Sequence, residues 1–153
     1  MEANNVIYAF ATRGSVLTEL EVLSDALAND AVLIRITMHG DHTAEVPIDI
    51  YAAKELSKQI ANNQLVAMDE FRRMTYEYET GSQLTDPVPA YSYSSKDGSE
   101  LKIYRVARHW MIEVTSTEFR IQIPATPSEL NRVGLALNFG VSAWANKFSP
   151  PSA

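Results

Sequence analysis

Apolar and polar residues alternate along the first fifty positions in a manner typical of β-strands. Between Val32 and Met38 an apolar residue occupies every second position, which places these side chains on one face of a strand over 31–38. Less regular alternation predicts further strands over 6–10, 16–22 and 46–50. A helical pattern begins near Ala52. We therefore expect the first part of the chain to be a run of strands closed by a helix.

The second part of the chain repeats this order of elements. Asp97-Gly98 is a strong hairpin signal, because both residue types tolerate positive φ. The apolar pattern around and after this turn predicts strands over 91–93, 101–106, 110–114 and 119–123. Thr126 and Glu129 then form a capping box, in which the side chain of each accepts the backbone N–H of the other. The helix that follows is expected to run to about Asn146.

Each predicted helix carries an apolar stripe at helical spacing, so one face can lie on a sheet. In the second helix the stripe consists of Leu130, Val133, Leu137, Val141 and Trp144. In the first helix it begins at Ala53, Leu56 and Ile60 and can be continued through Leu65, Met68 and Phe71. The first helix has no capping signal as good as the box of the second.

Details of the two stretches also correspond. Residues 34–37 match 112–115, and Glu55-Leu56 matches Glu129-Leu130. These matches favour a duplication, with chance similarity between two β-rich stretches as the alternative. The predicted fold is α+β, with two repeats of an antiparallel three- or four-stranded meander followed by a covering helix. We expect one domain over 1–153, with the first repeat over 5–79, a linker over 80–89, the second repeat over 90–148 and a tail over 149–153.

A unit of four strands and a helix, used twice, resembles the Whirly and PUR families. The likeness extends over nearly the whole chain as an order of elements, and no motif residue of those families carries over. It implies tandem units that bind single-stranded nucleic acid across their sheets. Separately, the apolar strand and helix over 46–60 resemble small enterobacterial and prophage proteins of the biofilm-regulator BssS type. That likeness implies a regulatory or accessory protein of bacterial or phage type.

The composition limits the cellular compartment and the kinds of partner that we expect. The chain has no cysteine, which excludes disulfides and thiolate sites and fits a reducing cytoplasm. No run of 18 apolar residues is present, and the first residues lack the pattern of a signal peptide. We therefore expect a cytoplasmic protein without a membrane partner. The net charge of −6 is uneven, because residues 1–83 carry 13 acids and 6 bases, whereas residues 84–153 carry 6 acids and 7 bases.

The familiar motifs of catalysis are absent from the sequence. It contains no nucleophile elbow, phosphate loop, zinc-protease helix or dinucleotide fingerprint, so we expect no enzyme and no cofactor. His39 and His42 flank Asp41 and could form a weak metal site. A solvated turn explains the same residues, because Gly and Asp suit turn geometry. We interpret this segment as a turn and predict no metal site.

Cations and aromatic residues occur together on the strands of the second repeat, among Tyr91, Tyr93 and Tyr104. Cations bind the phosphates of single-stranded nucleic acid, and aromatic rings stack on its bases. An ordinary solvated face with half-buried tyrosines is the alternative. The leading hypothesis is a non-enzymatic binding or regulatory protein that acts on single-stranded nucleic acid or on a nucleic-acid-handling partner. The residues predicted to bind are Lys96, Lys102, Tyr104, Arg105, Arg108 and Arg120.

The acidic first repeat supports a second hypothesis. Glu19 and Glu21 occupy positions where the second repeat has Ile103 and Arg105. The alternative function is therefore a protein–protein interaction module, such as an acidic phage inhibitor of a host factor that mimics DNA. The opposite charges of the two repeats also suggest a homo-oligomer in which an acidic sheet faces a basic sheet.

Overall fold

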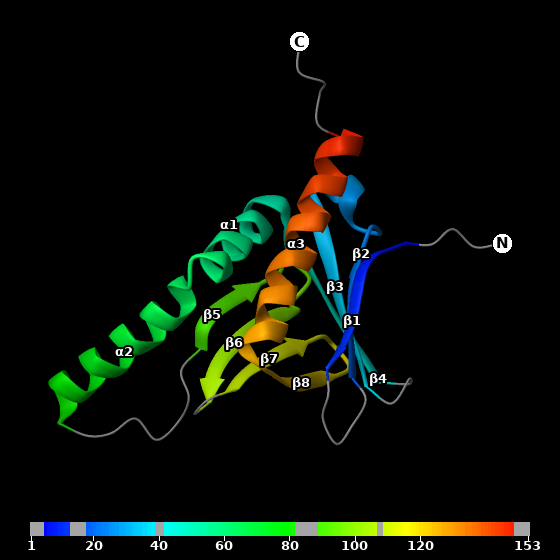
Figure 1. Cartoon of the computed structure of the whole chain (residues 1–153). Coiled ribbons are helices and arrows are strands. Elements are labelled where there is room, and N and C mark those ends of the chain that lie inside the picture. The colour runs from blue at the N-terminus through cyan, green and yellow to red at the C-terminus, as the bar shows by residue number, and fades with distance from the viewer. Residues whose placement is uncertain (1–4, 13–17, 39–41, 82–88, 107–108, 149–153) are drawn as a thin grey trace, which may run out of the picture.

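The computed structural model describes residues 5–12, 18–38, 42–81, 89–106 and 109–148, and it has two antiparallel four-stranded sheets (Figure 1). In each sheet the strands follow one another in chain order as a meander. The first sheet contains β1 (Val6–Thr12), β2 (Thr18–Leu23), β3 (Ala31–Met38) and β4 (His42–Asp49). The second sheet contains β5 (Pro89–Ser94), β6 (Glu100–Val106), β7 (His109–Thr115) and β8 (Arg120–Ala125). The α+β fold with two meanders is thus confirmed.

Helices follow each meander. The first meander leads into α1 (Ile50–Ala61) and α2 (Gln64–Thr80), and the second leads into α3 (Pro127–Phe148). A short 3-10 turn, η1 (Leu27–Asn29), joins β2 to β3. The expectation of one helix per repeat is wrong for the first repeat, because Asn63 adopts a left-handed conformation with φ of 56° and separates α1 from α2. α1 and α3 lie side by side, and the far end of α2 extends beyond the sheets (Figure 1).

The starts of α1 and α3 are fixed by side chains that accept backbone N–H groups. At α3 the predicted capping box is present, because Thr126 Oγ1 accepts from Glu129 N at 3.1 Å and Glu129 Oε1 accepts from Thr126 N at 3.0 Å. At α1 Asp49 Oδ1 accepts from Ala52 N at 2.8 Å. This second cap has no clear signal in the sequence, because β4 runs into α1 without a turn between them.

The predicted strands agree with the observed ones within a few residues. β3 has the predicted bounds, whereas β4 begins at His42, so this histidine is a strand residue and not part of a turn. The predictions also covered residues 16–17, 39–41, 82–88 of the expected linker and 149–153, which lie outside the described residues. No helix of the described chain is long and apolar enough to cross a membrane.

One apolar core lies between the inner faces of both sheets and the helices. Its fully buried side chains include Ile34 of the first sheet, Ile112 of the second and Leu56 of α1. The α3 stripe enters the same core, with Leu130, Val133 and Leu137 buried and Val141 and Trp144 partly buried. Because side chains alternate along a strand, each sheet keeps a second, outer face away from this core.

Candidate nucleic-acid interface

The outer face of the second sheet carries the polar and aromatic residues of three neighbouring strands. In the register, Lys102 lies beside Glu113, which lies beside Gln122, and Tyr104 lies beside Met111 in the next row. Neighbours across antiparallel strands share a face. We call this set the Tyr104 face, and it consists of Lys102, Tyr104, Met111, Glu113, Arg120 and Gln122. Sequence reasoning missed three of these residues, although counting alternate positions from the buried Ile112 identifies Met111 and Glu113.

Glu113 is the centre of the hydrogen bonds on the Tyr104 face. Its side chain is only 2% exposed, and its Oε1 accepts from Arg120 Nε at 2.8 Å and from Gln122 Nε2 at 2.6 Å. The Tyr104 hydroxyl donates to Oε2 at 3.4 Å. Burial alone would raise the pKa of Glu113, but the hydrogen bonds from Gln122 and Arg120 outweigh it and bring the pKa below its ordinary value. Glu113 is therefore ionised at neutral pH and fixes its neighbours in place.

The neighbours of Glu113 keep charges and donors that a ligand can reach. The side chain of Arg120 is 63% exposed, so the guanidinium can meet a ligand while Nε stays bound to Glu113. Lys102 pairs with Glu100 at 3.3 Å, a hydrogen bond that raises the pKa of the lysine, and its side chain is 31% exposed. Burial and the nearby Glu113 carboxylate raise the pKa of Tyr104, which therefore remains a neutral phenol. The face thus combines an aromatic ring with two cations, each of which is paired with a carboxylate.

A hollow opens on the Tyr104 face beside the aromatic ring. Its volume is about 310 Å³, and its lining consists of Tyr104, Val106, Met111, Arg120 and Gln122. Apolar groups form part of the wall, while a guanidinium and an amide supply donors. A hollow of this composition suits a flat, partly polar ring with an anionic group nearby.

Arg105 lies on the opposite face of the second sheet. Its partner in the register is the buried Trp110, and its Nη1 lies 3.4 Å from Glu70 Oε1 and 3.9 Å from Asp69 Oδ2, both on α2. Asp69 is buried and also pairs with Arg73. The expectation that Arg105 joins Lys102 and Arg120 is therefore wrong. Odd and even positions of β6 face opposite sides, and Arg105 attaches α2 to the sheet.

Lys96, Tyr91 and Tyr93 are also separate from the Tyr104 face. Lys96 is exposed in the turn between β5 and β6, where it lines a different pocket of about 410 Å³ together with Tyr93. Tyr93 donates from its hydroxyl to Asp49 Oδ2 at 3.1 Å. Burial raises the pKa of Tyr91 to about 12, with smaller effects from Tyr93 and Asp49. Both rings belong to the inner side of β5, and Arg108 lies outside the described residues.

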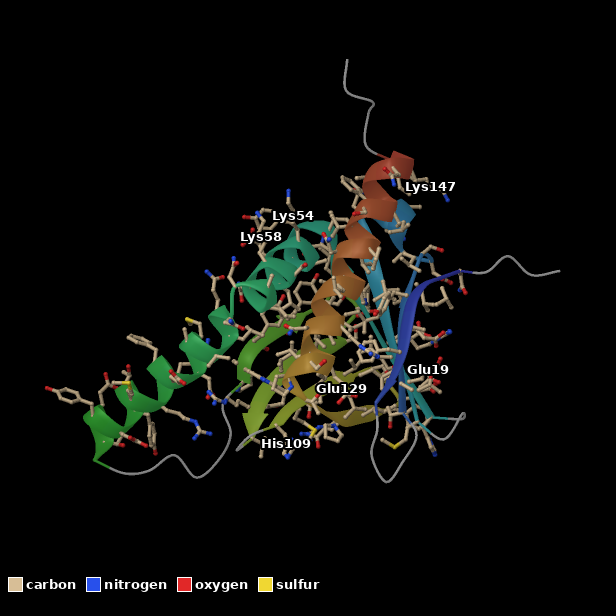
Figure 2. The ribbon with its side chains drawn as sticks, in the orientation of Figure 1. Glu19, Lys54, Lys58, His109, Glu129 and Lys147 are labelled. Atoms are coloured by element: carbon tan, nitrogen blue, oxygen red, sulfur yellow. The ribbon has the colours of Figure 1, made fainter. Side chains whose placement is uncertain are left out.

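The outer face of the first sheet is acidic. Glu21, Arg35 and Glu45 lie side by side in one cross-strand row, and Glu19 lies beside Thr37 in the next. Arg35 Nη2 lies 3.0 Å from Glu21 Oε1, so this carboxylate is partly neutralised. Glu19 is exposed and lies on the side of the sheet away from α3 (Figure 2). We call Glu19, Glu21, Arg35 and Glu45 the acidic face.

His42 has an aromatic neighbour. It is exposed at the start of β4, and its ring lies edge-on to Phe119 with 5.1 Å between the centroids. His39 and Asp41, the other members of the candidate metal cluster, lie outside the described residues. Within the described part of the chain, no three histidine or carboxylate side chains are grouped as a metal would require.

No protein-family model matches the chain, and no curated protein matches it either. The geometry of the two outer faces is therefore the basis for a functional assignment.

Proposed function

We propose that this protein is a non-enzymatic, cytoplasmic protein that binds single-stranded nucleic acid on the Tyr104 face. The observation that supports this function is the hollow of about 310 Å³ beside Tyr104. An aromatic ring next to a cavity can stack on a base, and a nearby guanidinium can bind the phosphate of that base. Arg120 lies at the hollow itself, and Lys102 lies one row away on the same face. Together they offer two phosphate contacts.

The charge of the whole chain sets the expected strength of this binding. With a net charge of −6, long-range attraction for nucleic acid is absent, so affinity has to come from contacts made on the face. Stacking of a base on an aromatic side chain contributes about 1–3 kcal/mol. Each phosphate contact adds about −0.7 to the slope of log affinity against log salt for a single strand. We therefore expect modest affinity with a shallow salt dependence.

The test measures binding of labelled single-stranded DNA and RNA of mixed sequence by fluorescence anisotropy at several salt concentrations. Tyr104→Ala should weaken binding by about 1–3 kcal/mol at every salt concentration. Arg120→Ala and Lys102→Ala should each lower affinity for all sequences and reduce the salt slope by about 0.7. Lys54→Ala is the matched control, because it removes one exposed cation from α1, far from the face in the chain and on a different element.

The Arg105→Ala variant distinguishes the Tyr104 face from the site predicted from the sequence, which included Arg105. Because Arg105 contacts α2, its loss should lower stability while leaving the salt slope unchanged. If no single strand binds even at low salt, the proposal is wrong. It is equally wrong if Lys54→Ala reduces binding as much as Arg120→Ala does.

The acidic face supports a second candidate function, the docking of a basic protein. Three carboxylates and one guanidinium lie on this outer face, and Glu19 is freely exposed. A partner with a basic patch would be steered to it by charge. In that case Glu19→Gln combined with Glu45→Gln should reduce binding of a basic peptide, whereas Tyr104→Ala should leave it unchanged. Finding peptide binding and no nucleic-acid binding would favour this candidate over the first.

A further inference from the structure

An apolar stripe on α2 is left uncovered by the rest of the chain. Only Leu65 and Asp69 of this helix are buried. Phe71 is 66% exposed, Met74 is 70% exposed and Tyr78 is 92% exposed. Their spacing of three and four residues places them on one side of the helix, and we call them the α2 stripe. Three large apolar side chains in one exposed row indicate an interaction surface.

The two halves of α2 differ in how well the rest of the chain supports them. The second half of the helix extends beyond the sheets, so it gains no support from the core (Figure 1). Most of the stability of a protein helix comes from packing of its apolar face, and the buried residues of the 17-residue α2 lie only in its first half. Burial of the α2 stripe would supply the missing stabilisation.

The charges beside the α2 stripe define which partner fits. Glu77 flanks the stripe on one side and Glu79 flanks it on the other. Glu70 lies on the same side as Glu77 but already pairs with Arg105. The two cations of the helix are already engaged, because Arg72 donates to the Pro89 carbonyl and Arg73 pairs with Asp69. The complementary surface should therefore be basic.

Two copies of α2 do not satisfy this condition with each other. In an antiparallel two-fold pair, a flank of one helix lies along the same flank of the other. The flank that carries Glu77 would then oppose its own copy, and neither copy would offer it a free cation, because Arg72 and Arg73 are engaged within the chain. Direct pairing of the two α2 stripes is therefore disfavoured.

The outward side of α1 provides the complementary surface. Tyr51 is 75% exposed, and Lys54 and Lys58 follow it at spacings of three and seven residues, on the same side of the helix. Figure 2 shows both lysines projecting together from α1. Neither lysine takes part in an ion pair with another described residue. We call Tyr51, Lys54 and Lys58 the α1 patch.

We propose that two copies of this chain form a dimer in which the α2 stripe of each copy packs on the α1 patch of the other. The contact is isologous, as a two-fold dimer requires. It sets Glu77 and Glu79 against the partner's lysines and covers Phe71, Met74, Tyr78 and Tyr51 of both copies. The area buried is on the order of 1,200 Å², which reaches the range of specific interfaces. This dimer leaves both sheet faces open and does not depend on nucleic-acid binding.

The experiment measures the mass of the full chain in solution by sedimentation velocity from micromolar to millimolar concentration. The wild-type chain should form a dimer, and Phe71→Ser combined with Tyr78→Ser should weaken dimerisation at least tenfold. These side chains are exposed in the monomer and lie outside the core, so the near-ultraviolet circular dichroism of the buried Trp110 should remain unchanged. Leu135→Ser is the matched control, because Leu135 is an exposed apolar residue of α3 outside the proposed contact.

Charge reversal tests which surfaces meet. Lys54→Glu with Lys58→Glu should weaken the dimer, and Glu77→Lys with Glu79→Lys should do the same. An equimolar mixture of these two double variants should form a heterodimer in which both contacts are complementary, one with the wild-type charges and one with the charges reversed. The chain with all four changes should also dimerise again. A monomer throughout the concentration range would overturn the proposal. The proposal would also be wrong if changes to the α2 stripe abolished the dimer while reversal of the lysines had no effect. In that case the two α2 helices would pair directly with each other.

Discussion

Gly140 of α3 lies where the helix comes closest to the first sheet, and an added methyl group tests that contact. A Cβ atom at this position would lie 2.8 Å from Val32 Cγ1, 3.0 Å from Val32 Cγ2 and 3.2 Å from Val22 Cγ1. Both valines are fully buried, and β-branched side chains have little freedom to rotate away. In Gly140→Ala the helix has to move outward or the valines have to shift.

Two opposing effects determine the size of the change. Alanine is a better helix former than glycine by about 1 kcal/mol, which favours the variant. Overpacking of a filled core costs about 1–3 kcal/mol, which opposes it. The expected net result is a loss of about 0–2 kcal/mol in the free energy of unfolding, measured by urea denaturation followed by circular dichroism. Ser142→Ala, at an exposed position of the same helix, is the control for helix propensity alone.

A double-mutant cycle reveals whether the close approach is the cause. In a Val32→Ala background the two nearest methyl groups are gone, so Gly140→Ala should now stabilise the protein by up to about 1 kcal/mol. The sign of the effect should therefore change between the two backgrounds. If Gly140→Ala stabilises the wild-type chain and the Val32→Ala chain equally, the packing of α3 on β2 and β3 described above is wrong.

Two further predictions concern the core and the Tyr104 face. Leu137→Ala should cost about 2–5 kcal/mol in urea denaturation, because this side chain is fully buried, and a loss below 1 kcal/mol would contradict its place in the core. The pKa of Glu113 is lower in the folded state than in the unfolded state. Its contribution to stability is therefore fully present above the unfolded pKa of about 4.3, and it is lost as the pH falls through the folded pKa. Wild type should therefore lose its advantage over Glu113→Gln below about pH 4, and a difference independent of pH would refute this role.

The strands and the α3 cap could be predicted because each depends on local signals. Period-two alternation defined β3, and the pairing of Thr126 with Glu129 is readable from four consecutive residues. The break between α1 and α2 has no comparable signal, because an asparagine adopts the left-handed conformation without a neighbouring glycine or proline. The length of the first helix could therefore not be set from the stripe alone.

The candidate site was only partly predictable, because its residues were grouped by position along the chain and not by face. Lys102 and Arg105 are three residues apart, an odd separation, so a strand places them on opposite sides. The role of Glu113 depends on donors from two other strands, Tyr104 and Gln122, whose register is set by the whole sheet. Register is a tertiary property, so a single strand sequence does not reveal it.

The shared core has a consequence for the ancestry of the two repeats. Each meander with its first helix is apolar on one side, and that side is covered by the other unit through the contact of α1 with α3. A chain holding only one such unit would leave this surface open to water, and a second copy of itself would be the simplest cover. If one gene segment gave rise to both repeats, its product is best pictured as a symmetric pair. Fusion of two such segments would turn an association that depends on concentration into a permanent one, and it would leave the two outer faces free to differ in charge.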